Sequence, residues 1–539
     1  MLRTVLLLSS WIWGSLVLAG MAPNIVFIIA DDLGWNDVSY HGSDLNTPVL
    51  DQLAREGLRL EQHYTQPECS TTRASLLTSR YIVRTGLQAD VILNGGGMAL
   101  PLNETLMSDY LKQLGYKNYL VGKWHQGANS WRETPVFRGF DYFYGYYGGQ
   151  IHYFGHYHTK FGGHDFRRDY RDEQGNFKQD ILKNELGNYL TKSLTDEAIR
   201  IVKENENSKD PMFLYFALPN THSPNQSPKG YVDKYFPKDS KITDYDRKQL
   251  AGNLGGLEEA VKNLTDVLKA SKQWDNTLLV FISDNGGAPQ GLMSYAGQSN
   301  YPLRSGKTTL FEGALRVPAF VSGPLVKHLA GKENHGMFHV SDWFPTLHAL
   351  IKQRTGKSVK LVSEIDGVDQ AGMIFKNEPS ARKEMLHQLN LGNQAYRLGD
   401  YKIIVGNPGE YDGYVRHADK PDIKIKYDEP TDFWGKLKCS IGLCGGFGDF
   451  ITDKDGAKVR LYNLKDDPNE TYNIAAKHPD IVKKMRERIE KFKGIVMPAQ
   501  ENDRINAAHH KNSGGIWVPW KDDVRRDQVD YRILEKTEL

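Results

Sequence analysis

Strand-like and helix-like segments alternate along about the first 350 residues, and this alternation limits the fold more than any other feature. Residues 24–30, NIVFIIA, form a continuous apolar run rich in β-branched side chains, which is typical of a buried parallel strand. Residues 47–57 begin with Thr-Pro and end with Gly, as helices do. Segments of both kinds follow as far as the apolar run at 277–283. The pattern predicts a doubly wound α/β fold, in which helices cover both faces of a large, mostly parallel sheet.

The texture of the sequence changes after about residue 390. Short alternating segments, turns rich in Gly and Asp, and one helical segment at 478–493 replace the earlier alternation. We predict a large N-terminal domain over 21–390 and a smaller C-terminal α+β domain with an antiparallel sheet over 391–539. The end of the chain, residues 521–539, carries charges of both signs, which is typical of a solvated or loosely docked segment.

Residues 1–20 have the layout of a secretory signal peptide: a basic residue, an uncharged apolar run and small residues before a proline. An uncleaved membrane anchor is the alternative, because the apolar run is nearly long enough to span a bilayer. Entry into the secretory pathway is also indicated by four Asn-x-Ser/Thr sequons, at Asn103, Asn225, Asn263 and Asn469. We therefore expect a secreted or lysosomal glycoprotein without a membrane span after signal cleavage.

Charge and cysteine content exclude some classes of function. The 68 Lys and Arg residues nearly balance the 66 Asp and Glu residues, which argues against a nucleic-acid partner.

In an oxidising compartment Cys439 and Cys444 can pair with each other, which leaves Cys69 without an intramolecular partner. Cys69 precedes a helical segment, residues 71–81, whose N-terminus favours negative charge. It is a buried structural residue, the site of an intermolecular disulfide, or a functional group.

Polar side chains follow four of the predicted strands, at the point where each strand ends. They are Asp31 and Asp32 after the first, Lys123 and His125 after the second, His222 after the third, and Asp284 and Asn285 after the fourth. The carboxyl ends of parallel strands lie at one edge of a sheet, where ligands bind in such folds. Three carboxylates and an amide oxygen suit Ca²⁺ or Mg²⁺ better than zinc. With lysines and histidines beside them, they indicate a hydrolase of phosphate or sulfate esters.

A series of segments, in order along the chain, resembles the motifs of the sulfatase family. Among them are NIVFIIADDLGW from residue 24, CSTTRASLLTSRY from residue 69, VGKWHQG from residue 121 and ISDNGG from residue 282. The resemblance continues to GIWVPW at 515–520 and is strongest to the arylsulfatase B group, whose best-known member acts on sulfated N-acetylgalactosamine ends of glycosaminoglycans. It implies an alkaline-phosphatase-like fold and hydrolysis of sulfate monoesters, with a sulfated sugar or other small sulfate ester as the substrate.

The resemblance also gives Cys69 a role. In sulfatases the corresponding cysteine is oxidised to Cα-formylglycine by the formylglycine-generating enzyme in the endoplasmic reticulum, and the hydrated aldehyde is the nucleophile. The implied ligands of one Ca²⁺ are Asp31, Asp32, Asp284 and Asn285, with residue 69 completing the shell. The implied catalytic residues are Cys69, with Arg73, Lys123 and His125 beside it, and His222 and Lys307 at the leaving oxygen and the sulfate. We predict His125 as the base and His222 as the general acid.

Two residues of the nucleophile segment depart from the family pattern. Thr71 stands where sulfatases usually have Pro or Ala, and Ser79 stands where Gly is common. The fixed φ of a proline helps to present such a segment as an extended peptide to the modifying enzyme. Thr71 therefore keeps an alternative function open, that of a weakly active or inactive glycoprotein that binds sulfated glycans. A phosphohydrolase is a third reading, against which the retained cysteine argues.

Residues 141–166 are unusually rich in aromatic residues and histidine. Four histidines make this stretch a candidate for a second metal site: His152, His156, His158 and His164. The alternative is a loop near the mouth of the active site whose aromatic rings stack on sugar or aryl groups.

Overall fold

The computed structural model describes residues 20–238, 240–288, 296–361, 364–390, 392–414, 423, 451–452, 456–502, 509–521 and 530–535. Residues 1–19 of the predicted signal peptide lie outside this part, as do Cys439 and Cys444, so the signal peptide and the disulfide stay predictions. Among the helices of the described residues, none combines the length and the apolar composition needed to cross a membrane.

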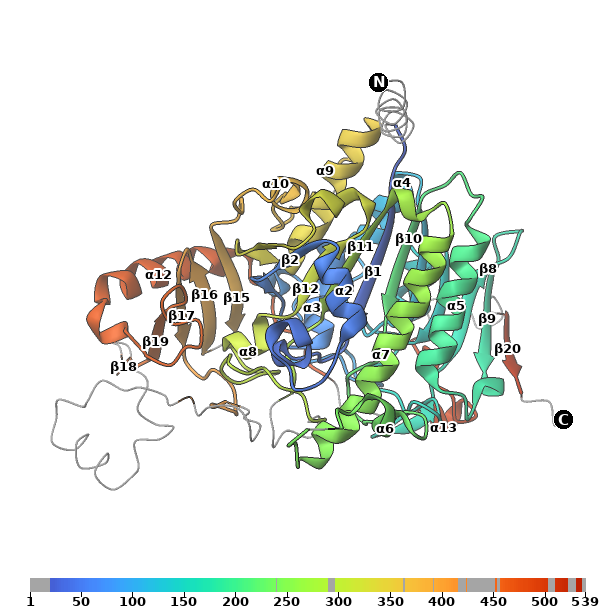
Figure 1. Ribbon diagram of the computed structural model, residues 1–539, viewed down its shortest axis with the longest axis horizontal. Coiled ribbons are helices and arrows are strands. Elements are labelled where there is room, and N and C mark those ends of the chain that lie inside the picture. Colours follow the sequence, from blue (N-terminus) through green and yellow to red (C-terminus); the bar gives the residue numbers. More distant parts are fainter. Residues whose placement is uncertain are drawn as a thin grey trace.

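An eleven-stranded sheet forms the centre of the molecule (Figure 1). Its strands lie in the order β13 (Lys332–Asn334), β2 (Leu58–Leu60), β12 (Ala319–Ser322), β11 (Thr277–Ser283), β1 (Asn24–Ala30), β10 (Met212–Ala217), β4 (Lys117–Lys123), β5 (Tyr142–Tyr146), β8 (Arg167–Arg171), β9 (Phe177–Leu182) and β20 (Asp530–Leu534). The strands from β11 to β5 are all parallel, whereas β12 and β8 are antiparallel to their neighbours. The polar residues that follow β11, β1, β10 and β4 are thus brought to one edge.

Helices cover both faces of this sheet because its central strands are apolar on both sides. Along β1, Ile25, Phe27 and Ile29 face one core, and Val26 and Ile28 face the other. The first core also contains side chains from α3 (Cys69–Thr78), α4 (Met107–Gln113) and α9 (Trp343–Thr355). The second contains side chains from α2 (Pro48–Arg55), α5 (Leu190–Glu204) and α7 (Tyr245–Ala270).

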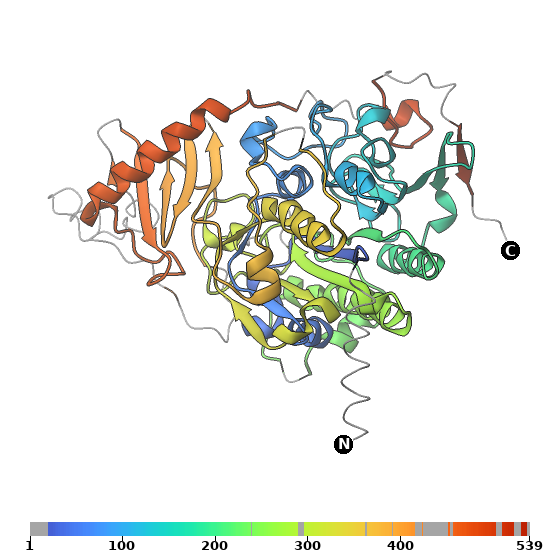
Figure 2. The same cartoon turned by 90° about the horizontal axis from the view of Figure 1, so that it is seen from above.

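A smaller antiparallel sheet follows in the sequence and packs beside the large one (Figure 2). It consists of β15 (Glu384–Asn390), β16 (Asn393–Leu398), β17 (Tyr401–Val405), β19 (Lys458–Asn463) and β18 (Ile451–Thr452), and α12 (Pro479–Phe492) lies across it. Lys402 on β17 forms fully buried ion pairs with Glu312 (2.9 Å) and Glu470 (2.8 Å), and the pair with Glu312 ties this sheet to the larger unit. The predicted fold class is confirmed.

The chain returns to the large sheet at its end, which the sequence did not indicate. The strand β20 pairs in parallel with β9, so part of the segment predicted to be solvated or loosely docked adds a strand to the sheet edge. The remaining short elements are β3 (His63–Tyr64), β14 (Phe338–His339), β6 (Tyr157–His158), β7 (Gly162–His164), α6 (Tyr231–Tyr235), α8 (Glu312–Leu315), α10 (Ala371–Lys376) and α13 (His509–Asn512).

Candidate active site

Acidic and basic side chains interlock at the edge of the sheet where β1, β4 and β11 end. Asp31 Oδ2 accepts a hydrogen bond from Lys123 Nζ at 2.7 Å, and Asp32 Oδ2 accepts one from Lys307 Nζ at 2.8 Å. All four side chains are buried. Burial, with the charges of Asp284 and Asp32, raises the pKa of Asp31 to about 7 against the opposing effect of Lys123. Asp284 and Asp32 therefore both disfavour the charge of Asp31 in this shared space.

The third carboxylate, Asp284, is held by Arg73. The guanidinium of Arg73 donates from Nε and Nη2 to Asp284 Oδ2, at 3.0 and 2.7 Å, and Nη1 donates to the carbonyl oxygen of Lys123. The other Asp284 oxygen accepts the backbone N–H of Asp32 at 3.2 Å. Arg73 is fully buried, so its planar fork fixes Asp284 and joins it to the end of β4.

Cys69 is the first residue of α3, and its side chain points into the carboxylate cluster. The Sγ atom lies 3.4 Å from Asp31 Oδ1 and 3.6 Å from Asp32 Oδ1. Burial and Asp284 raise the pKa of the Cys69 thiol well above its ordinary value, so the thiol is protonated in this setting. The Thr71 hydroxyl donates to the Glu68 carbonyl oxygen at 2.7 Å, so threonine fits the first turn of α3 without an unpaired polar group.

The two predicted catalytic histidines each use one ring nitrogen to bind a backbone carbonyl. Nε2 of His125 donates to Ile92 at 2.8 Å, which leaves the buried Nδ1 as the acceptor, without a hydrogen-bond partner. Nδ1 of His222 donates to Ser223 at 2.6 Å, and its Nε2 lies 3.7 Å from Asp32 Oδ2. Burial, with Lys123 and Arg73, lowers the pKa of His125 well below its ordinary value. Burial and Lys307 lower that of His222 to about 3. Both rings are neutral in this arrangement.

The donor atoms fit a hard divalent cation. Within the described part of the chain, one group of side chains brings at least three acidic, Cys or His ligand atoms within 4.8 Å of one another: Asp31, Asp32, Cys69 and His222. Asn285 joins this group, since its Nδ2 donates to Asp32 Oδ1 at 2.8 Å while its buried Oδ1 has no hydrogen-bond partner. Ca²⁺ and Mg²⁺ are bound in proteins by carboxylate and amide oxygens, and these side chains and Asp284 provide three carboxylates and one unpaired amide oxygen close together.

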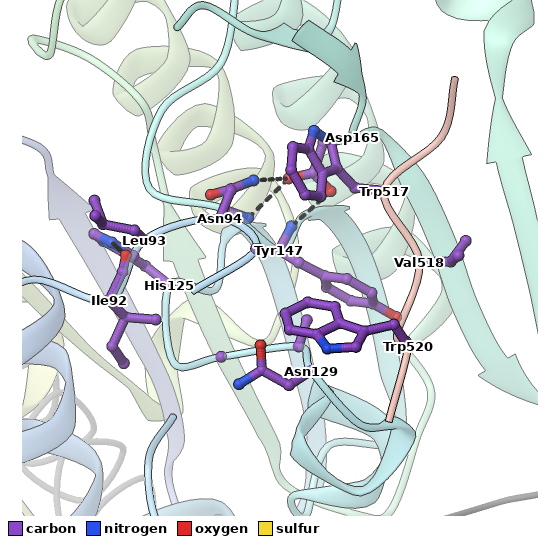
Figure 3. A pocket seen from close by; sticks show the side chains of 14 residues that line it. Ile92, Leu93, Asn94, His125, Asn129, Tyr147, Asp165, Trp517, Val518 and Trp520 are labelled. Atoms are coloured by element: carbon purple, nitrogen blue, oxygen red, sulfur yellow. Dashed lines mark hydrogen bonds between the residues drawn. The ribbon is translucent and has the colours of Figure 1, made fainter. Parts of the chain in front are cut away.

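The four histidines of residues 141–166 do not form a second such group among the described residues. His152 instead stacks on Tyr157, with ring centroids 4.7 Å apart. The same stretch supplies Tyr147 and Asp165 to a pocket that also touches His125 (Figure 3). The metal hypothesis for these histidines is therefore wrong, and part of the stretch lines a pocket.

Two features of the site were missed in the sequence. The carbonyl of Ile92 orients His125, and backbone groups leave no signal in a sequence. Trp517 and Trp520 line the pocket beside His125, although they lie about 390 residues further along the chain. They fall in the motif GIWVPW, which is part of the resemblance to sulfatases but implies no role for either tryptophan.

Known proteins resemble the chain over most of its length. The sulfatase family model matches residues 23–352, which is more than half of the chain. Arylsulfatase J of Mus musculus is 32% identical over 525 residues, covering 92% of this chain and 80% of that protein. N-acetylgalactosamine-6-sulfatase of Homo sapiens is 32% identical over 514 residues, covering 89% of this chain and 88% of that protein.

Solved structures agree with this likeness. The crystal structure of Ps i-CgsB has a TM-score of 0.68 and 27% identity, and covers 89% of this chain and 94% of that one. Its complex with k-i-k-neocarrahexaose has a TM-score of 0.68 and 26% identity, with 94% and 99% of the two chains covered. The family model and the curated relatives indicate the sulfatase family, and both the fold and the cluster of carboxylates around Cys69 are consistent with it. The chain therefore belongs to the sulfatase family and is a sulfuric ester hydrolase.

Proposed function

We propose that this protein removes sulfate from sulfated sugars, such as those of glycosaminoglycans, with a formylglycine formed from Cys69 as the nucleophile. The observation that carries the proposal is the position of Cys69, whose Sγ faces Asp31 and Asp32 between Lys123 and Lys307. Two of the similar proteins also support a sugar substrate, since one is an N-acetylgalactosamine-6-sulfatase and another is bound to a carrahexaose. The proposed likeness to the arylsulfatase B group rests on sequence motifs alone.

We assign the proposed Ca²⁺ to Asp31, Asp32, Asp284 and Asn285, together with residue 69. When bound, the ion neutralises the sulfate and makes the nucleophile more acidic. Lys123 and Lys307, which pair with Asp31 and Asp32 in this structure, would bind the sulfate oxygens once those carboxylates held the ion. Arg73 holds Asp284 in place and adds positive charge beside residue 69.

His125 has the tautomer that a general base needs. Because Nε2–H is bound to Ile92, the free lone pair belongs to Nδ1, which is buried and has no partner in the described structure. Ile92 is itself tied to the nucleophile helix, since its N–H donates to Ser70 Oγ at 3.1 Å. His125 is thereby fixed relative to residue 69, from whose hydroxyl it takes the proton.

His222 and Lys307 both lie beside Asp32, and we assign them to the leaving alcohol. Burial is the main cause of the lowered pKa of His222, and the charge of Lys307 beside it adds to the lowering. A sulfate ester anion that pairs with Lys307 offsets this second contribution and so favours the protonated ring. His222 then gives its Nε2 proton to the leaving oxygen.

The cellular setting belongs to the same proposal. Residues 1–20 direct the chain to the secretory pathway, where the formylglycine-generating enzyme acts on Cys69, and the mature protein is lysosomal or secreted. We assign residues 21–390 to the catalytic domain and 391–539 to the smaller domain, with two exchanges: β15 pairs with the smaller sheet and β20 pairs with the large one. The sequon residues Asn103 and Asn263 are exposed and open to glycosylation.

We expect the peptide that spans Cys69 to carry an aldehyde in place of the thiol when the protein is made in a eukaryotic secretory pathway with the modifying enzyme present. Tandem mass spectrometry of that peptide measures the converted fraction directly. In the Thr71→Ala variant, a larger fraction of Cys69 is expected to be converted to the aldehyde, because alanine restores the family pattern. A peptide that is quantitatively unmodified in both proteins would favour the alternative, a sulfated-glycan-binding protein without activity.

Ca²⁺ is expected to raise the melting temperature of protein that has been treated with a chelator. A ligand whose free concentration is 100 times its dissociation constant stabilises the folded protein by about 2.7 kcal/mol. Here the stabilisation comes from neutralising the repulsion among the carboxylates. Differential scanning calorimetry with and without Ca²⁺ measures the shift. Asn285→Ala, which removes the unpaired amide oxygen, is expected to lose most of it, and an unchanged melting temperature in the unsubstituted protein would count against the site.

A further inference from the structure

Lys307 lies on a loop, residues 304–311, that leads into α8 and that we call the lysine loop. Its side chain reaches Asp32, as described above. The next residue, Thr308, donates its backbone N–H to the carbonyl of Pro67 at 2.8 Å, and Pro67 lies two residues before the proposed nucleophile. The loop therefore touches both the carboxylate cluster and the segment that leads into α3.

The backbone of the lysine loop needs support from outside. Ser305 and Thr308 have φ angles of 64° and 72°, in the left-handed region that residues with a Cβ atom rarely adopt. The second is the less favourable of the two, because threonine is β-branched. Such conformations persist only where the surrounding structure holds them. The smaller domain supplies much of this support.

The lysine loop packs on one face of the smaller sheet. Leu310 and Phe311 are buried together with side chains from that sheet and the residue after it, namely Ala395, Ile404, Tyr462 and Leu464. Neighbouring residues on the same strands point to the other face and belong to a different core, which includes Tyr396, Ile403, Leu461 and Met485 of α12. A substitution under α12 can therefore weaken the smaller domain without touching the loop.

Hydrogen bonds fasten the lysine loop to the segment that follows β17. Near the start of the loop, Ser305 donates its N–H to the carbonyl of Gly413 at 2.6 Å and its hydroxyl to the carbonyl of Tyr411 at 2.8 Å. Near its end, the N–H of Leu310 donates to the carbonyl of Pro408 at 2.7 Å. The central residues of the loop thus stand between two attachments to the smaller domain.

Arg304 joins the start of the loop to three further points. Its fully buried guanidinium donates from Nε to Asp412 Oδ1 at 2.6 Å, and from Nη1 to the Tyr462 hydroxyl at 3.1 Å and the Glu470 carbonyl at 2.8 Å. Its Cζ atom also lies 4.2 Å from the centroid of the Phe311 ring, near the end of the loop. A planar fork with five N–H groups can make these contacts at once, which an ammonium group cannot.

We propose that Arg304 is a positioning residue for sulfate hydrolysis, which anchors the lysine loop on the smaller domain and thereby holds Lys307 at the sulfate. Displacement of a group that positions the substrate by about 1 Å can cost about 10²-fold in rate. The smaller domain thus takes part in the reaction, although the proposed reacting groups all belong to the large one. The inference rests on the proposed function, in which Lys307 binds the sulfate.

The test asks whether Arg304 acts through Lys307. It compares Arg304→Met, Lys307→Met and the double variant, each loaded with Ca²⁺. The dissociation constant of inorganic sulfate, obtained from the rise in melting temperature with sulfate concentration, needs no turnover. We expect it to rise about tenfold in Arg304→Met, the change that a weakened hydrogen bond to a charged group gives. The double variant is expected to lie within twofold of Lys307→Met, because no lysine is left to position.

Met485→Ala is the matched control, because it removes a buried side chain on the other face of the smaller sheet. It is expected to lower the melting temperature but to leave the dissociation constant of sulfate within twofold. Arg304→Lys is expected to recover part of the lost affinity, since it keeps the charge but not the fork. Asp412→Asn, at a partly exposed partner of the guanidinium, tests the same anchor if Arg304→Met does not fold.

Sulfate binding that stays within twofold in both Arg304→Met and Asp412→Asn overturns the inference. So does an equal loss in Met485→Ala, since the affinity would then follow the stability of the smaller domain. Losses that multiply in the double variant also overturn it, because Arg304 would act independently of Lys307. Unchanged sulfate binding in Lys307→Met refutes the proposed role of that lysine and the inference with it. If the unsubstituted protein cleaves no sulfate ester, the proposed function fails, whereas the expected pattern of sulfate binding would still support the role of Arg304.

Discussion

Cys69→Ala is expected to lower the rate of sulfate release by about 10⁴-fold or more, because nothing else at this position can attack sulfur. The fold is expected to persist, since alanine is a good residue for the first turn of α3 and the substitution removes one buried sulfur atom. Release of sulfate from a sulfated N-acetylgalactosamine substrate measures the loss, and circular dichroism checks the fold.

Thr71→Ala is the matched control for this experiment, because it changes a buried residue in the same turn of α3. It removes the hydroxyl that binds Glu68 but leaves the nucleophile intact, so its activity per converted molecule is expected to equal that of the unsubstituted protein. Activity of Cys69→Ala within tenfold of the unsubstituted protein would show that residue 69 is not the nucleophile. Equal losses in both variants would point to a general disturbance of α3.

Much of the site could be predicted because its residues follow strand ends. A parallel sheet brings the carboxyl ends of its strands to one edge, so Asp31, Lys123 and Asp284 reach the same edge because β11, β1, β10 and β4 are consecutive parallel strands. The start of α3 could likewise be placed near Cys69 from helical spacing. Periodicity and topology carry this information without any knowledge of side-chain contacts.

The remaining features depend on contacts between distant segments. Nothing in the spacing of GIWVPW shows that Trp517 donates to Gly162 or that Trp520 faces His125 across a pocket. The pairing of β20 with β9 joins segments about 350 residues apart, and a short mixed-charge strand has no periodic signal. Such long-range packing is decided by the whole fold, so the wall that Trp517 and Trp520 add to the pocket could not be predicted from the sequence.

His222→Gln is expected to slow the release of sulfate from a sugar far more than from 4-nitrophenyl sulfate. Glutamine keeps a polar side chain of similar size, but its amide does not act as an acid near neutral pH, and loss of a general acid lowers the rate by about 10²- to 10⁴-fold. A sugar alkoxide leaves only with a proton, whereas nitrophenolate is stable without one. The ratio of kcat values on the two substrates, for the variant and the unsubstituted enzyme, measures the effect.

The exposed His335 provides the control, since His335→Gln makes the same chemical change away from the site and is expected to alter neither rate. Equal losses of His222→Gln on the two substrates would assign His222 to holding the sulfate instead of protonating the leaving oxygen. The proton would then come from Lys307, whose Nζ lies against Asp32. Lys307→Met would in that case show the dependence on the leaving group that His222→Gln lacks.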